Sequence, residues 1–196
     1  MPKEYLRSLR NATEAYLCLA YSFRLPSVDV WKVDQEEFFV YFEQNQQLDL
    51  ANFIRKSIQN YAERVNELIW EYTRLFIGPY HLSCPPYESV YRDSKQIVMS
   101  QHATGVWKYY DRAGLTMSSD LVEPPDHISL ELEFISNLLS RAIRLKAKRD
   151  YYLSLKDEFL SEHVLRWVPQ FCGDVKSHAK LDYYYGLADL CLSYLG

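Results

Sequence analysis

Hydrophobic residues recur along this chain in steps of three and four, the spacing that places them on one face of an α-helix. The clearest pattern comprises eight positions: Leu50, Ile54, Ile58, Tyr61, Val65, Leu68, Tyr72 and Leu75. Asp49 is placed to cap its start, and Gly78 followed by Pro79 is a frequent way to end a helix. The pattern therefore predicts one long central helix from about residue 50 to residue 77.

Similar spacing predicts further helices before and after this one. They cover residues 5–23, 38–42, 100–115, 126–148, 151–164 and 181–195. Asp34 and Glu37 have the spacing of a capping box before the second of them. Pro169 and Gly173 predict a break before the last one. No stretch alternates as a strand does and no segment repeats, so we expect an all-α fold, a single-domain helical bundle over residues 1–196.

Composition and charge narrow the class of protein. The chain has 196 residues, is 48% hydrophobic and carries a formal net charge of -4, which suits one ordinary globular domain. A nucleic-acid binder usually has a basic surface, and the one basic run, over residues 141–149, lies at a predicted helix end where cations are favourable. We therefore expect no nucleic-acid partner, and the acidic balance suits a basic ligand.

Nothing in the chain predicts export or membrane insertion. The N-terminus lacks the apolar run of a signal peptide, and no segment approaches the roughly 20 apolar residues of a membrane span. We therefore expect a cytoplasmic protein whose four widely spaced cysteines are free thiols. A monomer is the default expectation, and a dimer formed by helix exchange is the alternative.

The start of the predicted helix at residue 126 carries the most unusual polar residue of the chain. On a helical wheel Glu131 falls in the middle of the apolar face, with His127 one turn before it. One interpretation is a structural pair that fixes the preceding loop. The other is that Glu123, Asp126 and His127 form an acidic corner for arginine side chains of a ligand. Helix N-termini also attract carboxylates as caps, so the pattern leaves both interpretations open.

Four segments carry a resemblance to a known family. They are Glu71–Pro79, Pro85–Tyr91, Glu123–Ile128 with Glu131–Phe134, and Phe159–Leu160 with His163–Pro169. In these segments and in their order, the chain resembles the cytoplasmic chaperones of the trimethylamine-oxide and dimethyl-sulfoxide reductase maturation family, the TorD/DmsD family of redox enzyme maturation proteins. Many relatives have Trp where Tyr87 stands, and the resemblance does not identify the partner enzyme.

The resemblance implies an all-helical, non-enzymatic chaperone without a cofactor. Members bind the twin-arginine signal peptide of a molybdenum-cofactor reductase precursor and assist its maturation before export by the Tat pathway. The implied peptide-binding residues form an apolar set, a loop set and a polar set: Tyr72, Leu75 and Phe76; Pro86, Tyr87 and Ser89; Glu123, Asp126 and His127. Glu131 is expected to support this site from within.

Two enzymatic alternatives remain beside this interpretation. His81 and Cys84, with Cys172 and His178, offer ligand types for a metal, although their spacing matches no standard zinc motif, and we expect no metal. The region of His127 and Glu131 has the chemistry for acid–base catalysis. It lacks any motif for a nucleophile, a phosphate loop or a cofactor.

Overall fold

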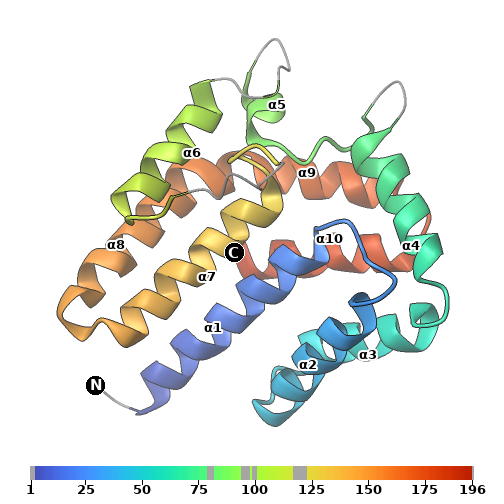
Figure 1. The fold of residues 1–196 in the computed structure, drawn as a ribbon, viewed down its shortest axis with the longest axis horizontal. Helices are drawn as coiled ribbons and strands as arrows, with labels where there is room; N and C mark the ends of the chain where they lie inside the picture. The colour runs from blue at the N-terminus through green and yellow to red at the C-terminus, as the bar shows by residue number, and fades with distance from the viewer. Residues whose placement is uncertain (1–2, 79–81, 94–97, 99–100, 117–122, 196) are drawn as a thin grey trace. The chain divides into compact units, whose positions relative to one another are not determined.

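The computed structural model describes residues 3–78, 82–93, 98, 101–116 and 123–195. These residues confirm the all-α prediction, because they contain helices and, in place of strands, a single isolated bridge between Tyr87 and His127. The helices are α1 (Lys3–Ser22), α2 (Trp31–Gln44), α3 (Leu48–Tyr61), α4 (Val65–Tyr72), α5 (Glu88–Arg92), α6 (Gln101–Arg112), α7 (Ile128–Arg144), α8 (Arg149–Phe159), α9 (Leu165–His178) and α10 (Asp182–Leu195) (Figure 1). Two π-helical turns, Thr73–Ile77 and Leu160–Val164, follow α4 and α8, and a short 3-10 turn, Lys146–Lys148, precedes α8.

The chain divides into two compact units. Unit 1 comprises residues 1–20 and 86–169, and unit 2 comprises residues 21–85 and 170–196. Two of the three division points fall inside helices, at residues 20/21 in α1 and 169/170 in α9, and the third falls in the loop at residues 85/86. That the chain forms one domain stays a prediction.

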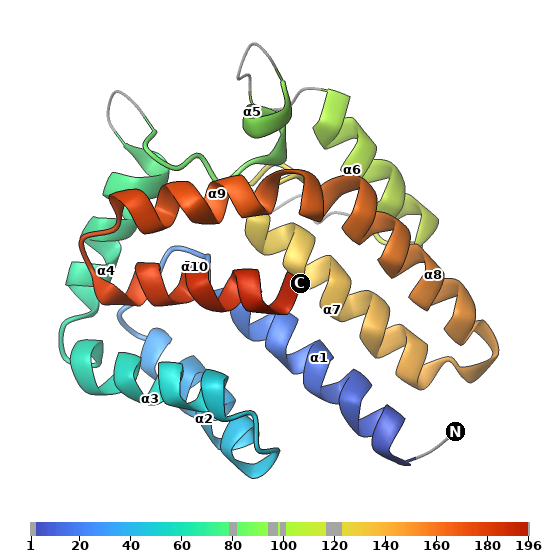
Figure 2. The ribbon, with the colours of Figure 1, turned by 180° about the vertical axis from the view of Figure 1, so that it is seen from behind.

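Unit 1 is built around α7, which buries the apolar face predicted from its sequence. Figures 1 and 2 both show α1 alongside α7, where the Ser136 hydroxyl donates to the Thr13 carbonyl at 2.9 Å. An aromatic cluster joins α6, α7 and α8: the ring of Phe134 lies 4.7 Å from that of Tyr110 and 4.8 Å from that of Phe159. Large buried aromatic surfaces of this kind contribute strongly to a core.

Unit 2 is built around the antiparallel pair α2 and α3, with α10 packed on α3. Tyr183 stacks on Phe53, with ring centroids 5.5 Å apart, and its edge faces Tyr61. Gly186 makes this packing feasible, because a Cβ atom there would lie 3.2 Å from the Phe53 ring. The small residue lets α10 approach α3 closely.

The predicted long central helix is wrong, because α3 ends at Tyr61 and α4 begins at Val65. The Arg64 guanidinium donates to the Asn60 carbonyl at 2.8 Å and so satisfies an acceptor that the end of α3 leaves open. Tyr61 and Val65 are both buried, so the apolar spacing continues across the break and hides it in the sequence. The helical turns do end at Gly78, as predicted, with a φ angle of 47°.

Two smaller predictions are also wrong. The second helix starts at Trp31 rather than after Asp34, because burial of the Trp31 side chain favours an additional turn. Pro169 does not break the chain but lies inside α9. Buried residues precede and follow it, including Trp167 and Phe171, and their burial outweighs one lost backbone hydrogen bond.

Among the helices of the described residues, none is long and apolar enough to cross a membrane.

Candidate functional site

Two segments that are far apart in sequence lie against each other in unit 1. The Ile128 amide donates to the Pro86 carbonyl at 2.9 Å, and the Glu88 amide donates to the Asp126 carbonyl at 3.0 Å. Prolines favour extended backbone, which leaves the carbonyl of Pro86 available to a neighbouring segment. The structure therefore brings the loop set and the polar set of the sequence prediction together.

Asp126 is fully buried and acts on the neighbouring segment. Its Oδ2 atom accepts a hydrogen bond from the Ser89 amide at 2.9 Å. Ser89 lies in the first turn of α5, where backbone amides have no partner within the helix. Asp126 thus caps α5 from outside, as the capping interpretation of the sequence anticipates for a carboxylate.

His127 is the N-cap residue of α7 and is also buried. Its Nδ1 atom accepts from the Ser129 amide at 3.1 Å and lies 2.8 Å from the Ser129 hydroxyl. Its ring packs edge-on against Tyr87, with the centroids 5.3 Å apart. The backbone of His127 is extended, with φ −73° and ψ 137°, so the helical spacing that suggested a pair with Glu131 does not apply to it.

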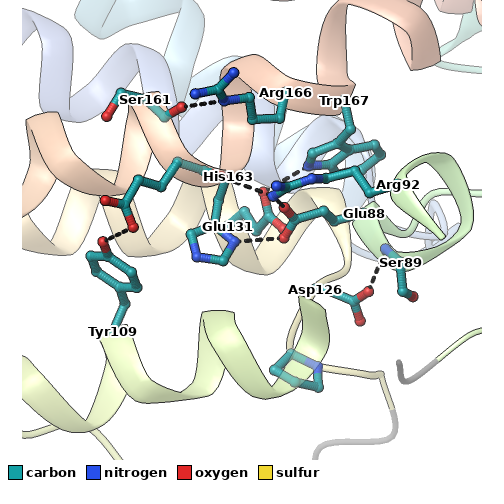
Figure 3. Close-up of polar contacts among 12 residues, drawn as sticks. Glu88, Ser89, Arg92, Tyr109, Asp126, Glu131, Ser161, His163, Arg166 and Trp167 are labelled. Atoms are coloured by element: carbon teal, nitrogen blue, oxygen red, sulfur yellow. Dashed lines mark hydrogen bonds and ion pairs between the residues drawn. The ribbon is translucent and has the colours of Figure 1, made fainter. Parts of the chain in front are cut away.

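Glu131 has other partners than the sequence suggested. Its Oε2 atom accepts from the indole nitrogen of Trp167 at 3.0 Å, and its carboxyl group lies close to that of Glu88 (Figure 3). Both carboxyl groups are fully buried. Burial and the nearby Glu88 charge raise the pKa of Glu131 well above its usual value, against the opposing effect of Trp167. The surroundings of Glu131 therefore favour its neutral carboxyl form more than water does.

Glu88 is held by two basic side chains. Its Oε2 atom lies 2.7 Å from Nδ1 of His163, and its Oε1 atom pairs with Arg92. Arg92 also donates to the Glu162 carbonyl at 2.8 Å. The ring of His163 fits against α6 because residue 105 is a glycine, where a Cβ atom would lie 3.0 Å from the ring. These bonds connect α5 to the π-helical turn Leu160–Val164.

Sequence reasoning missed Glu88, His163 and Trp167 as parts of this network. All three lie in segments that carry the family resemblance, yet none stood out on a helical wheel. His163 and Trp167 are four residues apart, the spacing that places two side chains on one helical face. The signal that could have revealed them was this pair of side chains with ring nitrogens on one face of a predicted helix.

The exposed part of the site is small. Tyr87 is half-buried, and its hydroxyl donates to the exposed Glu123 carboxylate at 2.9 Å. By contrast Pro86, Ser89, Asp126 and His127 are buried. Glu123 and Tyr87 are therefore the members of the loop and polar sets that reach the surface of unit 1.

The apolar set lies in unit 2 and belongs to its core. Leu75 is completely buried and Tyr72 and Phe76 nearly so, and their neighbours include Tyr184, whose ring lies 5.6 Å from that of Phe76. The adjacent Ile77 is 53% exposed. An apolar ligand at this end of α4 would meet Ile77 before any of the three predicted residues.

The proposed metal ligands do not form a site in the described part of the chain. His81 lies outside the described residues, and Cys84 and Cys172 are buried free thiols. His178 is exposed, with Nδ1 2.8 Å from the Asp174 carbonyl. Among the residues that the structure describes, no group of three or more His, Cys, Asp or Glu side chains is arranged to hold a metal ion.

Comparison with known proteins defines the class. The structure aligns with the crystal structure of a protein from Archaeoglobus fulgidus assigned as a redox enzyme maturation protein, with a TM-score of 0.63 over 93% of each chain and 24% identity, which establishes the fold. The sequence model of the nitrate reductase delta subunit family matches residues 42–173. The chain belongs to this family, which confirms the resemblance noted from its motifs.

Two relatives of known class support this family assignment. The chain is 24% identical over 141 residues to chaperone protein TorD of Aliivibrio fischeri, covering 71% of this chain and 66% of that protein. It is 27% identical over 140 residues to chaperone protein TorD of Vibrio cholerae, covering 70% of this chain and 63% of that protein. The chain thus spans somewhat less than two thirds of the length of these relatives. They are named as chaperones rather than enzymes, which supports the prediction of a non-enzymatic protein.

Proposed function

We propose that this protein is a cytoplasmic chaperone that binds the twin-arginine signal peptide of a molybdenum-cofactor reductase precursor. Holding the signal peptide delays export of the precursor by the Tat pathway until the cofactor is inserted. The relatives named chaperone protein TorD support the class of protein. The client enzyme stays open, with trimethylamine-oxide, dimethyl-sulfoxide, nitrate and formate reductases as candidates.

The observation that carries this proposal is the acidic corner of unit 1. Glu123 presents a carboxylate at the surface, and Asp126 and His127, which follow it in the same segment, are buried. Guanidinium groups pair with carboxylates through charge-assisted and often bidentate hydrogen bonds. The surface carboxylate of Glu123 therefore offers a complementary acceptor to the guanidinium groups of a peptide with two adjacent arginines.

The buried residues of the predicted site act in this proposal by shaping the surface. Ser89, Asp126 and His127 fix the positions of Tyr87 and Glu123 through the hydrogen bonds described above. Tyr72, Leu75 and Phe76 lie in the core of unit 2, and Ile77, the next residue along the chain, is the exposed apolar side chain that would contact the apolar stretch of the signal peptide. Ordered supporting residues reduce the entropic cost of binding.

Calorimetric titration with synthetic signal peptides tests the proposal. A peptide with Arg-Arg should bind, and Glu123→Gln should weaken it by about tenfold, the usual effect of losing one charge-assisted hydrogen bond. Glu63→Gln is the matched control, since that side chain is 89% exposed in unit 2 and pairs only loosely with Lys32, at 3.7 Å. Absence of binding by Arg-Arg and Lys-Lys peptides alike would overturn the proposal.

The apolar contact has a separate test. Ile77→Ser changes an exposed side chain and should weaken binding without a large loss of stability, whereas Phe76→Ala would disturb the core of unit 2. Val40→Ser, at a side chain 50% exposed on α2, is the control. Equal affinities for the Ile77 variant and the wild type would remove this end of α4 from the binding surface.

A further inference from the structure

One end of unit 1 is strongly basic, although the chain as a whole is acidic. This basic end consists of residues 3–10, at the start of α1, and residues 144–151, where α7 connects to α8; Figures 1 and 2 show both at the same end of the unit. The two ranges contain seven basic and two acidic residues, a formal charge of +5, whereas the whole chain carries -4. The basic end therefore has a charge opposite in sign to that of the chain.

The cations of the connection between α7 and α8 are largely unused by the fold. Arg141, just before them, has a structural role, because its guanidinium donates to the Ala113 carbonyl at 2.8 Å. The side chains of Arg144, Lys146 and Lys148 are exposed, and within the part of the chain that the structure describes none of the three has an ion pair or a hydrogen bond. These three cations are available to a partner.

The electrostatics of the helix ends explains only part of this charge. Cations are favourable in the last turn of a helix, where Arg141 and Arg144 of α7 lie. Lys146 and Lys148 lie beyond that turn, in the 3-10 turn between the helices. Lys3 lies in the first turn of α1, where the helix dipole disfavours a cation. A concentration of cations that does not stabilise the helices favours an anionic partner.

Apolar side chains are exposed among these cations. Leu145 is 46% exposed, Tyr151 at the start of α8 is 45% exposed, and Tyr5 at the start of α1 is 42% exposed. Cations beside exposed leucine and tyrosine side chains suit a membrane interface, where the headgroups accept the charge and the apolar parts enter the boundary with the acyl chains. A nucleic acid would pair with the cations but offers no apolar layer to Leu145.

We propose that the basic end of unit 1 docks on the surface of a membrane that contains anionic phospholipids. Arg144, Lys146 and Lys148 contact the headgroups, and Leu145 and Tyr151 enter the boundary between headgroups and acyl chains. The same surface repels the acidic remainder of the chain, which orients the docked protein. This inference goes beyond the proposed function, because docking requires no signal peptide.

Co-sedimentation of the full chain with lipid vesicles tests the proposal. Vesicles that contain phosphatidylglycerol and phosphatidylcholine should bind the chain, and vesicles of phosphatidylcholine alone should not. Each cation near an anionic surface strengthens binding about fivefold, so Lys146→Gln combined with Lys148→Gln should weaken binding about 25-fold. Binding by wild type should also weaken as salt is added, because salt screens the attraction.

Two lysines of unit 2 provide the matched control. Lys56 and Lys180 are exposed and lie outside the basic end, so Lys56→Gln combined with Lys180→Gln changes the net charge by the same amount. This control should bind the vesicles as wild type does. Equal weakening by the two double variants would show that net charge alone determines binding, and it would overturn the docking surface.

Leu145→Ser tests the apolar contact. Loss of a half-exposed leucine from the acyl boundary should weaken binding about fivefold. Leu48→Ser, at a leucine of unit 2 that is 63% exposed, is the control and should leave binding unchanged. If Leu145→Ser also binds as wild type does, the contact is purely electrostatic and docking at the interface is wrong.

The remaining outcomes separate this inference from the proposed function. Absence of binding to phosphatidylglycerol vesicles overturns the docking surface and leaves the chaperone proposal standing, since the vesicles contain no peptide. Binding of duplex DNA as tightly as of the vesicles, at the same salt concentration, would show an unselective cationic surface and overturn it as well. Vesicle binding by a chain that binds no signal peptide overturns the proposed function alone.

Discussion

Glu71 and Glu131 are buried carboxyl residues, one in each unit, yet their surroundings shift their pKa values in opposite directions. Glu71, in unit 2, accepts from Arg74 Nε at 2.7 Å, from Arg74 Nη2 at 2.6 Å and from the Lys180 amide at 2.6 Å. Burial raises the pKa of Glu71, but these donors outweigh burial and lower it overall. This carboxylate is a charged and fully bonded connection between α4 and the start of α10.

Glu131 has one nitrogen donor, Trp167, and a second carboxyl group beside it. Burial and the Glu88 charge therefore raise its pKa. The comparison teaches that the donors around a buried carboxyl, rather than burial itself, decide which form it takes. The donors around Glu71 stabilise its charged form, whereas the surroundings of Glu131 favour its neutral form.

The largest effect is expected at Glu71. Replacing it by Ala leaves the Arg74 guanidinium without its bidentate partner and the Lys180 amide without an acceptor. We expect a loss of about 3 kcal/mol in the free energy of unfolding, as is usual when one member of a buried pair is removed. Urea denaturation at pH 7 measures this change.

An exposed ion pair of the same spacing is the control. Arg64 and Glu67 are also three residues apart, but their side chains are 55% and 37% exposed. Glu67→Ala should change the free energy of unfolding by no more than about 0.5 kcal/mol. Similar losses for both variants would show that the donors around Glu71 contribute nothing beyond an ordinary surface pair.

The pH dependence of stability is the next test of the comparison. In the unfolded chain a Glu side chain titrates near 4.3, whereas folded Glu131 keeps its proton to higher pH. Unfolding then releases a proton, so the contribution of Glu131 to stability is lost as pH rises through its folded pKa, by up to about 1.4 kcal/mol per unit. Glu131→Gln has no such proton to release. Above pH 5 its free energy of unfolding relative to wild type should therefore rise with pH, by up to the same slope.

Glu71 should give the opposite sign. Its folded pKa is lowered, so its contribution is present above the unfolded pKa and is lost as pH falls through the folded one. Denaturation curves of wild type, Glu71→Gln and Glu131→Gln between pH 3 and 8 measure both slopes. Parallel curves for wild type and Glu131→Gln would show that Glu131 is not a protonated acid in the folded protein.

A smaller effect is expected from Trp167→Phe. The change removes the indole N–H donor to Glu131 and keeps most of the buried ring, so we expect a loss of about 1–2 kcal/mol. Trp70→Phe is the matched control, because that side chain is 70% exposed and should cost less than about 0.5 kcal/mol. If the two variants unfold at the same urea concentration, the Trp167 bond does not hold Glu131 in place.

The fold was largely predictable because the apolar spacing follows burial. The first and last helices, α6 and α7 appear close to the predicted bounds. The spacing could not reveal the break at residues 62–64, since the residues before and after it face the same core. It also could not show that Pro169 is tolerated inside α9, which depends on packing rather than on local preference.

The site was predictable in its segments but not in its contacts. The wheel identified Glu131 as a polar residue in an apolar face, and it is fully buried. Its partners Glu88 and Trp167 are 43 and 36 residues away in the sequence. Helical spacing carries no information on contacts at such separations. His127 was assigned to the helical face although it is the cap, where the backbone is extended.

The smallest effect on stability is expected at the exposed end of the same network. Tyr87→Phe removes the hydroxyl that donates to Glu123 at the surface, and we expect a change of less than about 0.5 kcal/mol in the free energy of unfolding. Its effect on peptide affinity can have either sign, and the sign discriminates between two roles. Tighter binding would show that the hydroxyl competes with the peptide for Glu123, and weaker binding would show that it orients the carboxylate. Tyr5→Phe, at an exposed tyrosine of α1, should change neither quantity, and an unchanged affinity for Tyr87→Phe as well would remove this hydroxyl from the binding surface.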